Sequence, residues 1–133
     1  MLGSGDNSDD LLVSATNNAQ GCIDLPRSVR QIRHVRDQRQ TEYDQAQTLQ
    51  TGALSNGAEL KSDLMQALSA SLIADNDYLN WAQQQEADCQ AGTAPPGIDS
   101  ANTQAGNDKT SFIVLWNPIA EQYGLQQETQ ATM

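Results

Sequence analysis

The sequence is poor in the residues that build most catalytic and nucleic-acid-binding sites. Its 133 residues include one histidine, two cysteines and six aromatic residues, with seven basic residues against 17 acidic ones and a formal charge of −10. Because phosphate contacts need a positive surface, this charge argues against a nucleic-acid binder. No run of 18 apolar residues is present, so we expect no membrane span. No charged start precedes an apolar stretch, so we expect no signal peptide.

Residues that favour strands are also scarce. Four valines and six isoleucines are present, against 17 glutamines and nine asparagines. The strongest strand candidate, 112–116, lies within a longer apolar pattern of helical period and is interpreted as helix. The sequence therefore predicts an all-α fold, and its length suits a single domain.

Apolar residues at helical spacing predict four helices. Their expected ranges are about 8–21, 25–49, 57–89 and 100–123. Short loops between long amphipathic helices favour an antiparallel up-down helical bundle, here of three long helices and a shorter N-terminal one. We expect one domain at 8–125, a disordered leader at 1–7 and a frayed tail at 126–133.

Local signals mark where these helices begin and break. Asp24 is expected to cap the second helix, and Asn56 with Glu59 resembles a capping box for the third. Near the end of the fourth helix, Pro118 either kinks the helix or opens a short final turn capped by Asn117.

The two cysteines can form a disulfide, half of a metal site or two free thiols. If the second and third helices meet across a loop centred near residue 53 or 54, Cys22 lies about one turn from the level of Cys89, at the same end of the bundle. We therefore expect a disulfide, which implies an oxidising compartment. The lone His34 lies far from both cysteines, so we expect no metal site and no cofactor.

All five arginines recur at every third position from Arg27 to Arg39. A basic face for nucleic acid or a protein partner is one interpretation. However, a three-residue step turns the helix by about 300°, which spreads the series around its axis. We therefore expect Arg27, Arg30 and Arg33 to lie in solvent.

A buried ion pair is predicted at the centre of the bundle. Asp75 interrupts the apolar stripe of the third helix, and Arg36 and Arg39 lie on the core face of the second. The assumed register pairs Arg36 with Asp75, with Arg39 nearby and Tyr43 or Tyr78 completing the network, because a buried guanidinium needs a carboxylate. The pair is expected to fix the helix register; the alternative is a polar ligand site.

The remaining candidates for chemistry are few. His34 and Asp37 could form a base and its orienting carboxylate, but no spacing supplies a nucleophile, so we interpret His34 as a surface residue and the chain as no enzyme. The aromatic residues at helical spacing are expected in the core rather than on a stacking platform: Trp81, Phe112, Trp116 and Tyr123.

Several segments resemble a helical domain of actinobacterial membrane and exported proteins. They are 25–29 leading to Arg39, 71–75 with 78–82, and 112–120 with 123–125, of which Trp-Asn-Pro and Ala-Asp…Trp-Ala are the most specific. The resemblance covers about residues 19–128. It implies paired cysteines at Cys22 and Cys89, a parent protein anchored by a preceding transmembrane helix, and no established activity. The short first helix and the lack of an anchor depart from the family.

These observations favour a non-enzymatic, extracytoplasmic, monomeric domain for recognition or structural support, with an unknown protein partner. Two alternatives stay open. One is a small acidic cytosolic module that masks a basic site, as an inhibitor or immunity protein does, and the redox state of the cysteines separates it from the first. The other is a small-ligand sensor, which a well-formed pocket beside Arg36 and Asp75 would favour.

Overall fold

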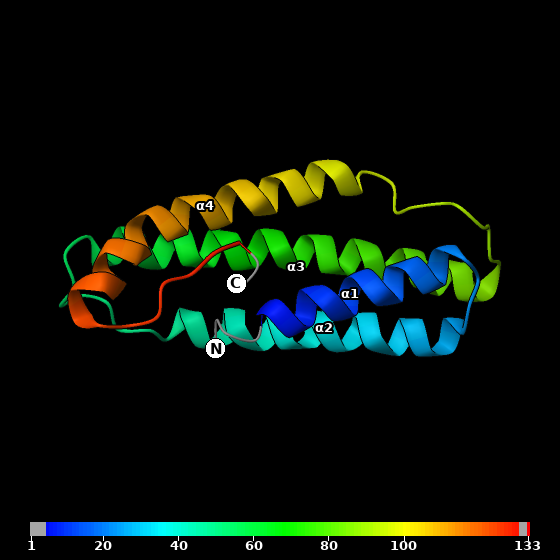
Figure 1. Ribbon diagram of the computed structural model, residues 1–133, viewed down its shortest axis with the longest axis horizontal. Helices are drawn as coiled ribbons and strands as arrows, with labels where there is room; N and C mark the ends of the chain where they lie inside the picture. Colours follow the sequence, from blue (N-terminus) through cyan, green and yellow to red (C-terminus); the bar gives the residue numbers. More distant parts are fainter. Residues whose placement is uncertain (1–4, 131–132) are drawn as a thin grey trace.

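The computed structural model describes residues 5–130 and 133, and it is helical in four segments. The helices are α1 (Gly5–Gln20), α2 (Leu25–Gln47), α3 (Gly57–Ala87) and α4 (Ile98–Tyr123). They run up and down along one long axis (Figure 1), and the described residues contain no strand, which confirms the predicted all-α antiparallel bundle. Within the described part of the chain, none of the helices is both long and apolar enough to span a membrane.

The central helix of the bundle is α3. It packs against α2 on one side and α4 on the other, while α1 packs mainly on α2 and covers one face of the layer (Figure 1). The chain after α4 turns back along that same face and ends near the middle of the molecule (Figure 1). One face of α3 is therefore covered by α1 and the C-terminal segment.

Backbone conformation, rather than side-chain caps, sets the starts of α2 and α3. Asp24 and Asn56 are the N-cap residues, as predicted, but both have left-handed backbone angles and neither side chain makes a cap hydrogen bond. The capping-box prediction for Asn56 and Glu59 is therefore wrong, because side-chain capping needs an extended N-cap residue. In addition, α1 begins at Gly5, so residues 5–7 are helical rather than part of a leader, and residues 1–4 lie outside the described residues.

The fourth helix continues through Pro118 and ends at Tyr123. Asn117 does not cap a new turn, because its side chain is used elsewhere. Its Nδ2 donates to the main-chain oxygen of Glu128 at 3.1 Å, and its Oδ1 accepts from the Glu128 amide at 2.8 Å. Gly124, with a left-handed φ of 65°, is the C-cap of the helix and turns the chain back.

The predicted frayed tail is wrong for its described residues. Besides the Asn117 contacts, the Trp116 indole Nε1 donates to the main-chain oxygen of Gln126 at 3.0 Å, and Gln130 Nε2 donates to the Thr110 hydroxyl at 2.8 Å. Met133 is fully buried. Hydrogen bonds and the buried side chain of Met133 hold the segment in place. Neither produces a repeating apolar pattern, so the sequence gives no sign of this order.

Two apolar clusters fill the bundle, one toward each end. The cluster at the α1–α2 turn consists of Ala15, Ala19, Val29, Ile32, Leu79, Trp81 and Ala82. The cluster at the α2–α3 loop consists of Ala46, Leu60, Leu64, Ala67, Leu68, Phe112 and Met133.

Three of the four predicted core aromatics contribute to these clusters. Trp81 and Phe112 are buried, and Trp116 packs partly buried against the loop-end cluster. Tyr123 is 58% exposed, so its assignment to the core is wrong. It lies in the last turn of α4, past Ala120, which is the last buried residue of that helix.

Candidate functional site

A disulfide closes one end of the bundle. The Sγ atoms of Cys22 and Cys89 are 1.99 Å apart and their Cα atoms 5.9 Å apart, across a sequence separation of 67 residues. Cys22 lies in the turn between α1 and α2, and Cys89 follows the end of α3. Gln85 adds a hydrogen bond across the same junction, since its Nε2 donates to the main-chain oxygen of Ala19 at 3.2 Å. The predicted pairing of the cysteines is confirmed.

A buried charged centre lies between the two apolar clusters. Arg39 Nε donates to Asp75 Oδ2 at 3.3 Å, and both residues are almost fully buried. Arg39 Nη1 also donates to the main-chain oxygen of Met133 at 2.7 Å, and its Nη2 lies 3.9 Å from a carboxylate oxygen of Asp9. The centre therefore joins α1, α2, α3 and the C-terminal segment through one guanidinium.

Asp75 forms the predicted buried ion pair with an arginine of α2, but its partner is Arg39. The predicted pairing of Arg36 with Asp75 is wrong. Arg36 Nε binds the neighbouring Asp37 at 2.7 Å, and its Nη1 donates to Asn76 Oδ1 at 3.2 Å. The assumed register paired Arg36 with Asp75, whereas Arg39 pairs with Asp75 and Arg36 with Asn76, so α2 is offset along α3 by about one helical turn from that register.

Neither predicted tyrosine completes the charged network among the described residues. Tyr78 Oη accepts a hydrogen bond from Asn102 Nδ2 at 3.0 Å, and Tyr43 packs against the loop-end cluster. The groups that do surround the pair include Asp9 and Lys109, both missed from the sequence. Lys109 was detectable in principle, because it lies one turn from both Ala105 and Phe112 on the apolar stripe of α4.

Burial controls the electrostatics of the charged centre. Desolvation raises the pKa of Asp75 above its ordinary value, although the charge and hydrogen bond of Arg39 oppose the rise. Desolvation and the positive charge of Arg39 lower the pKa of Lys109, opposed by the carboxylates of Asp9 and Asp75. The pKa of each group therefore shifts in favour of its neutral form.

A small cavity of about 60 Å³ lies among these charges. Arg39, Ser71, Asp75 and Lys109 contribute to its wall, and the buried Ser71 hydroxyl makes no hydrogen bond within the described structure. This volume admits a few water molecules but is far below the few hundred Å³ of ordinary ligand sites. The charged centre is therefore suited to fixing the helix arrangement rather than to binding an organic molecule.

The exposed basic residues form no comparable centre. Arg27, Arg30, Arg33 and His34 are all exposed, as predicted, and three of them line a shallow hollow beside Leu11. Among the described residues, no group of three or more histidine, cysteine, aspartate or glutamate side chains is placed to hold a metal ion.

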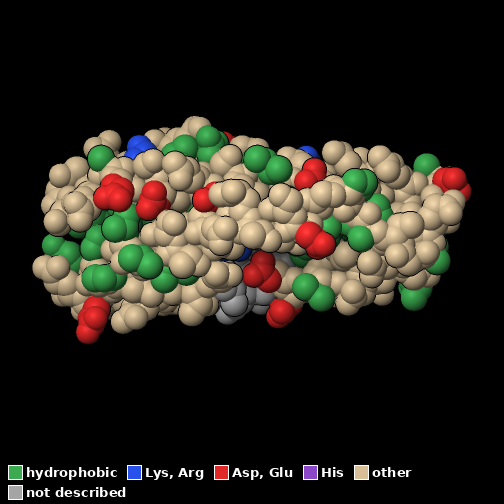
Figure 2. Space-filling view, turned by 90° about the horizontal axis from the view of Figure 1, so that it is seen from above, with side chains coloured by type: hydrophobic (Ala, Val, Ile, Leu, Met, Phe, Trp, Pro, Cys, Tyr) green, Lys and Arg blue, Asp and Glu red, His purple; other side chains and the backbone are tan. Residues whose placement is uncertain are grey.

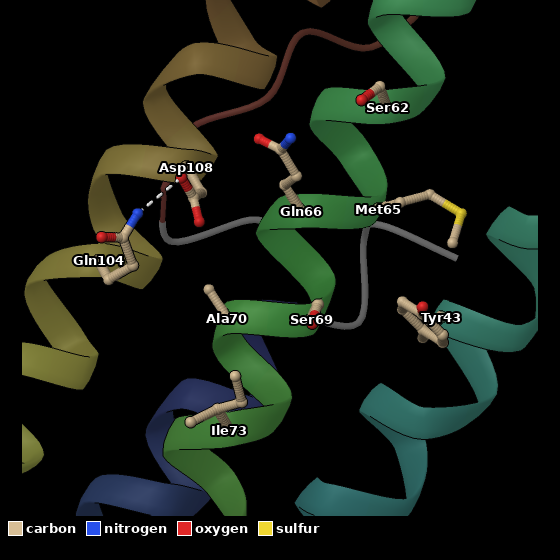
Figure 3. A pocket seen from close by; sticks show the side chains of 9 residues that line it. All are labelled: Tyr43, Ser62, Met65, Gln66, Ser69, Ala70, Ile73, Gln104 and Asp108. Atoms are coloured by element: carbon tan, nitrogen blue, oxygen red, sulfur yellow. Dashed lines mark hydrogen bonds between the residues drawn. The ribbon is translucent and has the colours of Figure 1, made fainter.

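An open groove with a volume of about 540 Å³ lies along α3, on the face opposite α1 (Figure 3). We call it the α3 groove. Its lining residues come from three helices: Tyr43 from α2; Ser62, Met65, Gln66, Ser69, Ala70 and Ile73 from α3; Gln104 and Asp108 from α4. Ile73 is 57% exposed, and Asp108 accepts a hydrogen bond from Gln104 at 3.0 Å. Asp108 is the one charged residue among those lining residues.

Acidic side chains outnumber basic ones on the surface around α4. Figure 2 shows them spread over the visible face, whereas Lys and Arg show little there. This distribution follows from the formal charge of −10, because five of the seven basic residues lie on α2. A cation or a basic segment would be attracted to this side of the molecule.

The chain matches no protein-family model, no curated protein and no solved structure in our comparisons. The resemblance to the actinobacterial helical domain is therefore not tested and stays a prediction.

Proposed function

We propose that this chain is a non-enzymatic, extracytoplasmic recognition domain that binds a basic amphipathic helix of a protein partner in the α3 groove. The open groove along the outer face of α3 carries the proposal. It leaves Ile73 exposed on the central helix, which is the helix that the bundle otherwise surrounds.

The dimensions of the groove suit one helix. From Ser62 to Ile73 the floor rises by about 16 Å, or three helical turns. The floor offers apolar contacts through Met65, Ala70 and Ile73, with polar side chains beside them. Helix-in-groove recognition uses this arrangement, with apolar anchors one turn apart along the bound helix.

The charge of the groove and its surroundings favours a basic partner. No lysine or arginine is among the residues that line the groove, and Asp108 supplies a carboxylate at the α4 side. The formal charge of −10 extends this preference over longer distances, because it steers basic partners toward the chain and repels acidic ones.

The disulfide supports the extracytoplasmic part of the proposal. Disulfides persist in oxidising compartments and are rare in the cytosol. The same bond disfavours the cytosolic inhibitor-like alternative, and the small volume of the charged cavity disfavours a ligand sensor at Arg39 and Asp75. Both alternatives therefore rank below the recognition domain.

A titration with a three-turn Leu/Lys amphipathic peptide, followed by NMR of the labelled chain, tests the groove. The groove residues should shift, and Ile73→Asp should weaken binding about tenfold or more, because a buried anchor contact is replaced by a carboxylate. The matched control is Val114→Asp, which adds the same charge at a residue that is 66% exposed on α4. It should leave binding unchanged or slightly stronger.

Two outcomes would contradict the proposal. In the first, the peptide causes no shift of the groove residues. In the second, I73D and V114D bind the peptide equally well, which would show that only the general negative charge attracts it. A Leu/Glu peptide of the same length measures the contribution of charge and should not bind.

A further inference from the structure

A half-enclosed apolar cavity of about 250 Å³ lies beside the α2–α3 loop. We call it the loop cavity. Its wall includes Leu54, Leu60, Leu64, Phe112, Trp116 and Lys61. We infer that the loop cavity is a binding site for a small aromatic carboxylate, a site separate from the α3 groove.

The size and apolar wall of the loop cavity point to an occupant. Empty apolar space in a core removes dispersion contacts and lowers stability in proportion to its volume. An apolar cavity of about 150 Å³ is already large enough to bind benzene. The loop cavity is larger than that, so it has room for one aromatic ring and a short side chain.

The two aromatic side chains favour a flat ligand. Phe112 and Trp116 have nearly parallel rings, with an interplanar angle of 11° and centroids 6.2 Å apart. The indole Nε1 of Trp116 already donates to Gln126, so its one hydrogen-bond donor is engaged. The ring therefore offers the cavity its apolar surface, on which an aromatic ligand can stack.

Lys61 selects the head group of the ligand. It is the one charged residue among those that line the cavity. Its apolar stem contributes to the wall, and its Nζ donates to the main-chain oxygen of Gln47, at the end of α2, at 2.7 Å. An ammonium has three donors, so two remain for a carboxylate that extends on a short chain from a ring in the cavity. A carboxylate attached to an aromatic ring would satisfy the ammonium and the apolar wall together.

The direct test is a titration with 3-phenylpropionate, followed through the two tryptophan indole N–H signals. Trp116 lines the loop cavity, whereas Trp81 belongs to the opposite cluster and serves as an internal control. The Trp116 signal should shift and saturate, and the Trp81 signal should stay in place. The neutral amide 3-phenylpropionamide should bind about three- to fivefold more weakly, because Lys61 is a partly exposed cation.

Variants at Lys61 separate recognition of the carboxylate from general apolar binding. Lys61→Gln should give the acid and the amide the same affinity, and Lys61→Arg should restore the preference for the acid. The inference is overturned if neither compound shifts Trp116 at millimolar concentration, if the parent chain binds both equally, or if K61Q keeps the preference. Because the α3 groove shares no lining residue with the loop cavity, none of these results bears on the peptide site.

Discussion

The two ends of the bundle differ in what closes them: a covalent bond at the disulfide end, and apolar burial with hydrogen bonds at the loop end. The first cluster combines three alanines with Val29, Ile32, Leu79 and Trp81, and the Cys22–Cys89 bond closes it. Leucines with Phe112 form much of the second, which adjoins a 250 Å³ cavity and is closed by hydrogen bonds of the C-terminal segment. The first end therefore has a crosslink in addition to its apolar burial, whereas the second has no crosslink.

The charged centre separates these two ends. Arg39 and Asp75 lie between the clusters and draw α1, α2, α3 and the C-terminal segment together. A buried pair of this kind adds little net stability compared with apolar residues, but it penalises any other register, because a shift would leave one charge buried and unpaired. The two ends therefore supply the stability of the bundle, while the charged centre fixes the register of its helices.

The largest expected effect is loss of the disulfide. Replacing Cys22 and Cys89 together by serine should lower the free energy of unfolding by about 4 kcal/mol, because the crosslink closes a long loop in the unfolded chain. Because the crosslink also holds the ends of α1 and α3 together, hydrogen exchange should show a larger loss of protection there than the global loss seen in amides around Leu64 and Phe112. Equal loss at both ends would contradict the proposed difference between them.

The next largest effect is expected from the charged centre. Asp75→Ala should lower the free energy of unfolding in urea by about 3 kcal/mol, since Arg39 then stays buried without its main carboxylate. The matched control is Asp44→Ala, which removes an exposed carboxylate from α2 and should change stability by less than about 0.5 kcal/mol. A loss below about 0.5 kcal/mol in D75A would mean that the pair does not hold the register.

Enlarging one apolar side chain at each end should change the free energy of unfolding in opposite directions. Leu54→Phe adds volume beside the loop cavity and should raise the free energy of unfolding by about 1 kcal/mol. Ala82→Val adds volume to a fully buried position in the cluster at the disulfide end and should lower the free energy of unfolding by about 1–3 kcal/mol. Thermal unfolding of both variants checks the pair. The same sign in both would show that the ends are equally well packed.

The smallest effect should appear as a pH dependence at Lys109. Burial lowers the pKa of Lys109 in the folded chain, so the charged form costs stability at neutral pH, and this cost disappears as the pH rises toward the unfolded value near 10.5. Lys109→Met should therefore be slightly more stable than the parent chain at pH 7, and the two should converge as the pH approaches 10.5. A gap that widens with pH would reverse the assigned sign.

A pH dependence of stability is also expected from Asp75. Burial raises its folded-state pKa, so its contribution to stability is present below the ordinary value of 3.8 and is lost as the pH rises through the folded-state pKa. The difference in unfolding free energy between the parent chain and D75N should therefore vary with pH in this window.

The sequence predicted the architecture well because the architecture rests on local signals. Apolar residues of helical period, Pro96 with Gly97 before α4, and Gly124 after it are each visible without knowing the fold. The Cys22–Cys89 bond could be predicted from the up-down order of α2 and α3. Both cysteines fall at the same end of the bundle even when the assumed register is wrong by one helical turn.

The partner of Asp75 could not be predicted from the sequence, because pairing of side chains depends on the exact register of α2 against α3. The choice between Arg36 and Arg39 depends on the position of α2 along α3, which the backbone of the 48–56 loop sets. The contact of Met133 could not be predicted either. Arg39 donates to its main-chain oxygen, which every residue type has, so no residue pattern in the sequence indicates the contact.

The redox state of Cys22 and Cys89 distinguishes a disulfide-closed bundle of an oxidising compartment from a cytosolic protein with two free thiols. The chain is expressed in an oxidising compartment, denatured and alkylated with and without prior reduction, and its intact mass is measured. A disulfide-closed bundle should be a monomer that takes up no label before reduction and two labels after it. Two labels without reduction would contradict the disulfide and would favour the acidic cytosolic binder.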